Sequence, residues 1–135
     1  MRPEFLHTFN SFREYIGGAV PELGSIITHW EDPFQSSKSR CILLPDSHAE
    51  AGDDVVFSLA LWAFTVEKNA DTIARTQIGV MEKIYEAVYS GNVPAPVIGA
   101  VINSADYFDP APQSPGIGVM RVSIKLTVEV LDDCD

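Results

Sequence analysis

The last long segment of the chain alternates between apolar and polar residues with a period of two. The apolar positions are Met120, Val122, Ile124, Leu126, Val128 and Val130. The polar positions between them are Arg121, Ser123, Lys125, Thr127 and Glu129. Because successive side chains of a strand point to opposite faces, this pattern predicts a strand over 120–130 with one core face and one polar face.

A second segment, residues 55–66, is apolar on both of the faces that a strand would have. One face carries Val55, Phe57, Leu59 and Leu61. The other carries Val56, Ser58, Ala60, Trp62 and Phe64. A strand of this kind should be covered on both sides, so it belongs in the middle of a sheet.

Two segments have the apolar spacing of amphipathic helices. Residues 3–17 begin with Pro3, which suits the first turn of a helix, and end at Gly17-Gly18, which predicts a stop. Residues 70–90 follow Asn69 and Asp71, both good capping residues. Apolar residues recur on one side of each segment, so each helix is expected to pack one face against a sheet.

Shorter apolar runs predict three further strands, at 24–30, 40–44 and 97–108. Two stretches are predicted to be exposed loops: the acidic 46–54, and 109–116 with its three prolines. The order of elements is therefore α-β-β-β-α-β-β. It predicts one α+β domain over 1–135, with a mostly antiparallel five-stranded sheet and two helices on one face.

Two helices on one side leave the other side of the sheet without cover. The residues predicted to form an apolar patch there are Val56, Ala60, Trp62 and Phe64. Exposed apolar patches mark interfaces, and a closed oligomer would cover this one economically. The alternative is that the N-terminal segment or a long loop of the same chain covers it.

Charge and composition exclude several classes of protein. The formal net charge is −10 at pH 7, and the nine Lys and Arg residues do not cluster, which disfavours a nucleic-acid reader. No apolar run reaches the roughly 18 residues of a membrane span, and the N-terminus lacks the order of a signal peptide. We therefore expect a cytoplasmic protein, with Cys41 and Cys134 as free thiols.

Motifs that carry chemistry are missing from the sequence. It contains no Gly-x-Ser-x-Gly elbow and no phosphate-binding glycine loop. His7, His29 and His48 stand alone, and Gly116-Ile117-Gly118 precedes a strand where a phosphate cradle needs a helix. The acidic stretch 46–54 has oxygen ligands for calcium but fails the EF-hand pattern. We expect no catalytic residue, cofactor or metal, and hence no enzyme.

The order of elements, with the ending 106–130, resembles the tail-terminator and tail-completion proteins of long-tailed bacteriophages. In that ending a strand enters a proline-rich loop and a long alternating strand follows, from Asp106-Tyr107-Phe108 through Asp109-Pro110-Ala111-Pro112 to Val130. The strand at 55–66 and the helix after it are similar to the central strand and second helix of the family. The resemblance is one of pattern and transfers no individual functional residue.

This resemblance implies a structural protein of a phage or prophage tail. Members form a ring, commonly a hexamer, that caps the tail tube, ends its growth and joins it to the head or neck, while DNA passes through the lumen. The implied partners are further copies, the tube protein and a neck protein, and the implied locations are the host cytoplasm and then the virion tail. The candidate interface residues in the two loops are Asp46, His48, Glu50, Asp53, Asp54, Asp109, Gln113 and Ser114.

Two other functions stay open. One is another neck or minor tail subunit of related fold. The other is a small-molecule binding domain or enzyme, with a pocket between sheet and helices near Trp30, Trp62 and Tyr85.

Overall fold

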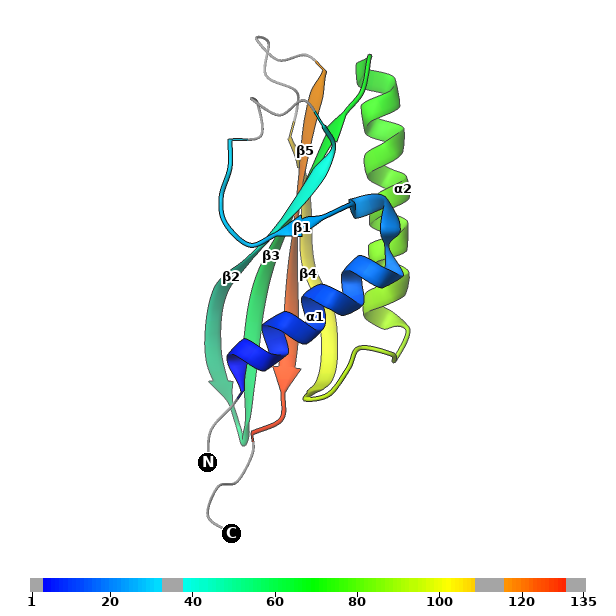
Figure 1. Ribbon diagram of the computed structural model, residues 1–135. Helices are drawn as coiled ribbons and strands as arrows, with labels where there is room; N and C mark the ends of the chain where they lie inside the picture. Colours follow the sequence, from blue (N-terminus) through cyan, green and yellow to red (C-terminus); the bar gives the residue numbers. More distant parts are fainter. Residues whose placement is uncertain (1–3, 33–37, 109–115, 131–135) are drawn as a thin grey trace.

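The computed structural model describes residues 4–32, 38–108 and 116–130. Helices α1 (Phe5–Ala19) and α2 (Ala70–Tyr89) lie on the same face of a five-stranded sheet (Figure 1). A short 3₁₀ helix, η1 (Pro21–Leu23), follows α1. The predicted α+β class, the order of elements and the two-helix arrangement are confirmed.

The sheet consists of β1 (Ile26–Ile27), β2 (Arg40–Ala51), β3 (Asp54–Val66), β4 (Val97–Phe108) and β5 (Ile117–Val128). Their order across the sheet is β1-β2-β3-β5-β4. Only the short β1 runs parallel to its neighbour, and the other three pairings are antiparallel. The two strands singled out by their sequence pattern, β3 and β5, therefore lie side by side in the centre.

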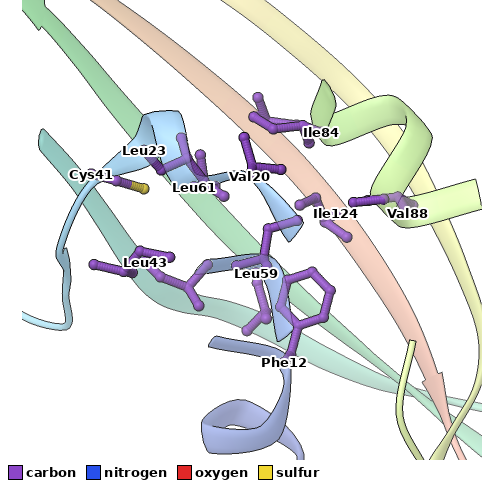
Figure 2. Close-up of a cluster of buried hydrophobic side chains, with 14 of the residues drawn as sticks. Phe12, Val20, Leu23, Cys41, Leu43, Leu59, Leu61, Ile84, Val88 and Ile124 are labelled. Carbon is purple, nitrogen blue, oxygen red and sulfur yellow. The ribbon is translucent and has the colours of Figure 1, made fainter. Parts of the chain in front are cut away.

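The core lies between the sheet and the helices (Figure 2). Phe12 of α1 and Ile84 of α2 are fully buried against Leu59 of β3 and Ile124 of β5. Every even position of β5 from Met120 to Val128 is fully buried on this side, as the alternation predicts. Large apolar side chains buried in this way contribute about 1.5–3 kcal/mol each to stability.

Both helices are close to their predicted bounds, but the predicted stop of the first is wrong. Helix α1 continues through Gly17 and Gly18 to Ala19, and the Val20 N–H still donates to the Ile16 carbonyl at 2.9 Å. Pro21 ends the helical hydrogen bonding instead, since it has no N–H to donate. At α2 the Asn69 side chain accepts from the Thr72 N–H at 2.9 Å, which confirms the predicted cap.

The acidic stretch 46–54 is not the exposed loop that its composition predicts. It extends β2 to Ala51 and pairs with β3, and a tight turn at Gly52-Asp53 joins the two strands. Gly52 has a positive φ of 66°, which suits glycine at such a turn. The polar residues are tolerated because this part of β2 lies at an edge of the sheet, where their side chains reach water.

Two other strand bounds are corrected. The strand predicted at 24–30 shrinks to the two residues of β1, because only Ile26 and Ile27 pair with β2. The final strand runs from Ile117 to Val128, so it starts earlier and ends earlier than predicted. Most of the loop predicted at 109–116 lies outside the described residues.

Candidate assembly surface

The face of the sheet opposite the helices carries an aromatic cluster at one end. The Trp30 ring meets Trp62 edge-on, with 5.1 Å between ring centroids, and Phe64 edge-on at 6.3 Å. Phe108 of β4 stacks on Trp62 at 6.1 Å. Trp30 remains 52% exposed and Phe108 45% exposed, so the cluster presents apolar surface to its surroundings.

Two arginines cover the same cluster. The Arg40 guanidinium lies 5.7 Å from the centroid of Phe64, and that of Arg121 lies 5.5 Å from the centroid of Trp62. Arg40 also pairs with Glu31, and Arg121 pairs with Asp46 at 3.6 Å. These cation–π contacts and ion pairs hold positive charge over the rings, within an acidic protein.

The predicted apolar patch is only partly exposed. Phe64 retains 2% and Ala60 5% of their surface, so the expectation that both are exposed is wrong. Trp30, on the segment after β1, contacts Phe64 edge-on, and Trp62 packs against the buried cluster that contains Phe64. Trp62 and Val56 are half-buried. The chain thus covers part of this face itself, as the alternative reading proposed, although an interface role for these four residues stays a prediction.

The predicted acidic interface residues lie on the β2–β3 hairpin. His48 and Glu50 pair with Phe57 and Val55 of β3, whereas Asp46 lies at a bulge after Pro45. Asp46, His48, Glu50 and Asp53 are exposed, and Asp54 is half-buried. Alternation along the hairpin separates the carboxylates onto two faces. Among residues 4–32, 38–108 and 116–130, no group of three metal-binding side chains forms. The other candidates, Asp109, Gln113 and Ser114, lie outside the described residues.

The sequence patterns did not predict a second apolar surface, which lies at the β4 edge of the sheet. Of the nine large apolar side chains that are exposed among the described residues, seven lie on α2 or β4. We call these seven the β4–α2 surface: Ile78, Tyr85, Tyr89, Ile98, Val101, Tyr107 and Phe108. The sequence pattern places Ile78 and Tyr85 on the apolar stripe of α2, but the sheet buries Ile73, Val80 and Ile84 and leaves these two exposed. A stripe wider than one buried face could have revealed this surface.

Side chains of helix α2 lie against the backbone of β5 at Gly118, where a Cβ would not fit. A Cβ at Gly118 would lie 2.3 Å from Ile73 Cγ2 and 2.9 Å from Gln77 Nε2. Gln77 is 4% exposed, and its Nε2 has no hydrogen-bond partner among the described residues. The residue also lines a groove of about 290 Å³ beside Tyr107 and Phe108. The sequence pattern placed Gly118 before the final strand, whereas the structure places it within β5, where a glycine often marks close approach of another element.

The residues predicted for a small-molecule pocket do not converge. Trp30 and Trp62 belong to the aromatic cluster, whereas Tyr85 is exposed on α2 and contacts Tyr89 at 4.6 Å between ring centroids. An open cleft of about 650 Å³ lies between α2, η1 and the end of β3. Its charged lining includes Glu22 and Lys83, which pair with each other at 3.3 Å.

The three histidines have different surroundings. His7 is exposed on α1, His29 lies 3.1 Å from Glu31, and His48 packs on Phe5. Cys41 faces the core, and burial raises the pKa of its thiol to about 12. No described helix is long and apolar enough to span a bilayer.

The fold is of a class in which a mixed five-stranded sheet has one face covered by helices. No protein-family model and no curated protein matches the sequence. Among solved structures, the chain is similar to one from a structure described as the virion of a native gene transfer agent particle. The two chains are 12% identical, with a TM-score of 0.57 over 90% of this chain and 91% of the other. At this identity the likeness shows a shared fold.

Proposed function

We propose that this chain is a structural protein of a phage-like particle, and that it serves there as the tail terminator. The observation that carries the proposal is the shared fold, which spans nine-tenths of this chain and of a chain from a virion. The match over nearly the full length of both chains means that the complete architecture is shared, beyond a common sheet motif.

The surface chemistry supports a role in assembly. Apolar side chains gather on two exposed regions, the aromatic cluster and the β4–α2 surface, and patches of this kind mark sites of protein contact. A net charge of −10 suits a ring through which DNA slides, because phosphates are not attracted to its wall. The expected partners are further copies, the tube protein and a neck protein.

The mechanism would be geometric. A terminator ring matches the end of the tail tube on one side and offers no tube-like surface on the other, so addition of tube subunits stops. The ring, commonly of six subunits in the family that the sequence resembles, then joins the tail to the head. The protein would be present in the host cytoplasm during assembly and afterwards in the virion tail.

Deleting the gene in the particle-producing host tests this proposal. We expect tails of irregular, excessive length without heads, measured on negatively stained particles, and recovery of uniform tails when the wild-type gene is supplied in trans. Headless tails of normal, uniform length would contradict the terminator role and favour a neck subunit. Normal particles would contradict both.

A further inference from the structure

We propose that copies of this chain associate head to tail, with the β4–α2 surface of one copy docked against the opposite edge of the next. That opposite edge, here the β2–α1 surface, consists of Leu6 and His7 of α1 and Ser47–Glu50 of β2. The inference deepens the proposed function, because it names the surfaces that would build the ring.

The first half of the contact is the open edge formed by β4. This strand has twelve residues, is the last in the sheet and contains a single charged residue, Asp106. Ile98 is 57% and Val101 48% exposed along it. A long, apolar and nearly uncharged edge strand is a template for pairing with another strand.

The edge is not equally open along its length. The Ile102 N–H donates to the Tyr89 hydroxyl at 2.9 Å, so a side chain of α2 already occupies the middle of the edge. The stretch from Val97 to Val101 lies before this cap, contains a register shift between Val97 and Gly99, and includes the two exposed aliphatic residues named above. A second strand would therefore pair first along 97–101.

The second half of the contact is the uncovered part of β2. Strand β1 pairs with β2 only at Cys41 and Ile42, which leaves 43–51 without an outer strand among the described residues. This part is level with the open stretch of β4 across the sheet. Val101 pairs with Lys125, Lys125 with Ser58, and Ser58 with Ser47. The two open stretches are thus at the same height on opposite edges.

Strand direction allows the two edges to join. The four strands β2, β3, β5 and β4 are successively antiparallel, so β2 and β4 of one copy run in opposite directions. A second copy placed beside the first in the same orientation brings its β2 antiparallel to β4. The sheet then continues from copy to copy with its helices on one side, which is a heterologous contact that closes into a ring when the rotation permits.

The helices provide a matching contact above the sheet. Phe5 lies against His48, with 5.0 Å between ring centroids, so the first turn of α1 sits at the β2 edge. The next residue, Leu6, is 74% exposed, the highest value among the exposed large apolar side chains of the described residues. In the head-to-tail arrangement this turn faces Tyr85 and Tyr89 of the neighbouring α2, and both sides bury apolar surface away from water.

Pairing of two β4–α2 surfaces about a twofold axis is the competing arrangement. It would bring Glu82 and Glu86, which flank Tyr85 on α2, close to the same acids of the other copy. Like charges at close range oppose association. The head-to-tail contact instead brings these acids toward the β2–α1 surface and the next turns of α1, which present His7, Arg13 and His48 as well as Glu14 and Glu50.

Disulfide trapping of the full-length protein tests the inference. In a Cys134→Ser background, Val101→Cys is combined with Ser47→Cys, or with Ala49→Cys to allow a shift of two residues. Cys41 does not compete, since its thiol is buried and its pKa is about 12. Within one copy, positions 101 and 47 are separated by three strand spacings, about 14 Å, which is too far for a disulfide. Any cross-link is therefore between copies.

We expect the double variants, mildly oxidised at high protein concentration, to give a ladder of dimer, trimer and larger species on non-reducing gels. Each single variant should stay monomeric, as should a control pair of Ser47→Cys with Lys68→Cys. Dimers from Val101→Cys alone would establish the twofold arrangement and overturn the head-to-tail contact.

Light scattering on the unmodified protein separates the remaining cases. An oligomer without a ladder overturns these surfaces and leaves the proposed terminator role standing, whereas a monomer without a ladder overturns self-docking altogether. The terminator role itself is decided by tail length.

Discussion

The two edges of the sheet are built in opposite ways. The β2 edge is covered or interrupted along part of its length: β1 covers Cys41 and Ile42, Pro45 removes one N–H, and a bulge follows at Pro45/Ser47. Its exposed part also carries Asp46 and Glu50. The β4 edge has twelve residues and one charge, and its protection comes from another element, through the Tyr89 hydroxyl.

Natural sheets usually blunt both edges, because an open edge invites uncontrolled pairing. Here proline and charge are concentrated on the β2 edge and exposed aliphatic and aromatic residues on the β4 edge, whereas register shifts occur in both edge strands. The β4 edge is thus the side that benefits from a partner, and the partly blunted β2 edge discourages pairing of β2 with itself. This difference shows that the residues along the two edges can by themselves favour association in one direction.

The largest expected effect concerns the covered part of the β2 edge, where Cys41 pairs with Ile26 of β1. Because burial raises the pKa of this thiol from 9.0 to about 12, the thiolate fraction near pH 8 falls on the order of a thousandfold. Iodoacetamide should therefore modify Cys41 at least a hundredfold more slowly in the folded Cys134→Ser variant than in urea. Modification at similar rates would show that the core around Cys41 is open to solvent.

The Cys41 thiol also makes the free energy of unfolding depend on pH. Between about pH 9 and 12 the folded chain keeps a proton that the unfolded chain has lost, so the free energy of unfolding should fall as the pH rises through this window. Below it, Cys41 contributes no slope. Urea titrations at several pH values check the sign, and Cys41→Ala should show a flatter alkaline decline.

The placement of α2 beside β4 is expected to depend on Gly118. Gly118→Ala inserts a Cβ into the side chains of Ile73 and Gln77, and overpacking of this kind costs roughly 1–3 kcal/mol of unfolding free energy. Gly99→Ala is the matched control on β4, because its Cβ would lie 3.7 Å from Thr127 in ordinary contact. Equal stability of the two variants in urea would mean that α2 does not depend on this close approach.

A lysine placed on each edge compares the edges directly. Val101→Lys and Ala49→Lys both alter exposed positions, so each should unfold within about 0.5 kcal/mol of the unmodified chain. Head-to-tail docking predicts that each weakens self-association at least tenfold in sedimentation equilibrium. If only Val101→Lys did so, the β2 edge would take no part in self-association, and the β4 edge would be the one that promotes it.

The smallest expected effect concerns the cap on β4. Tyr89→Phe removes the acceptor of the Ile102 N–H while keeping the ring against Tyr85. A lost neutral hydrogen bond of this kind costs about 0.5–1.5 kcal/mol. Hydrogen exchange at Ile102 should accelerate in the monomer, with little change at core amides such as Leu59. Unchanged exchange at Ile102 would show that the hydroxyl does not protect this edge.

The parts of the fold that could be predicted are those where periodicity and burial coincide. Strands β3 and β5 and helix α2 followed from patterns that local chemistry and tertiary packing both favour. The β2 extension was missed because Asp46, His48 and Glu50 look like loop residues, and only the neighbouring β3 explains why they are extended. Likewise, Trp30 belongs to no long strand, so its position over Phe64 depends on contacts distant in sequence.

The candidate surface was predicted in part. The alternation in β3 predicted that Trp62 and Phe64 lie on the face of the sheet opposite the helices. The edge strand could not be predicted, because strand order is set by pairing between segments far apart in the chain. The exposed residues of β4 and α2 became a single surface only once β4 was known to be the last strand.

The two ends of the molecule differ, and this gives any side-by-side assembly a polarity. The start of α1, the end of β5 and the β2–β3 turn lie together at one end (Figure 1). The aromatic cluster lies toward the opposite end of β3, where Trp62 pairs with Ile42 and Arg121. Copies joined edge to edge in one orientation would place all acidic turns, with Asp53 at their tips, on one rim and all the tryptophans nearer the opposite rim. Such a ring could bind one kind of neighbour above and a chemically different one below, without any subunit changing its shape.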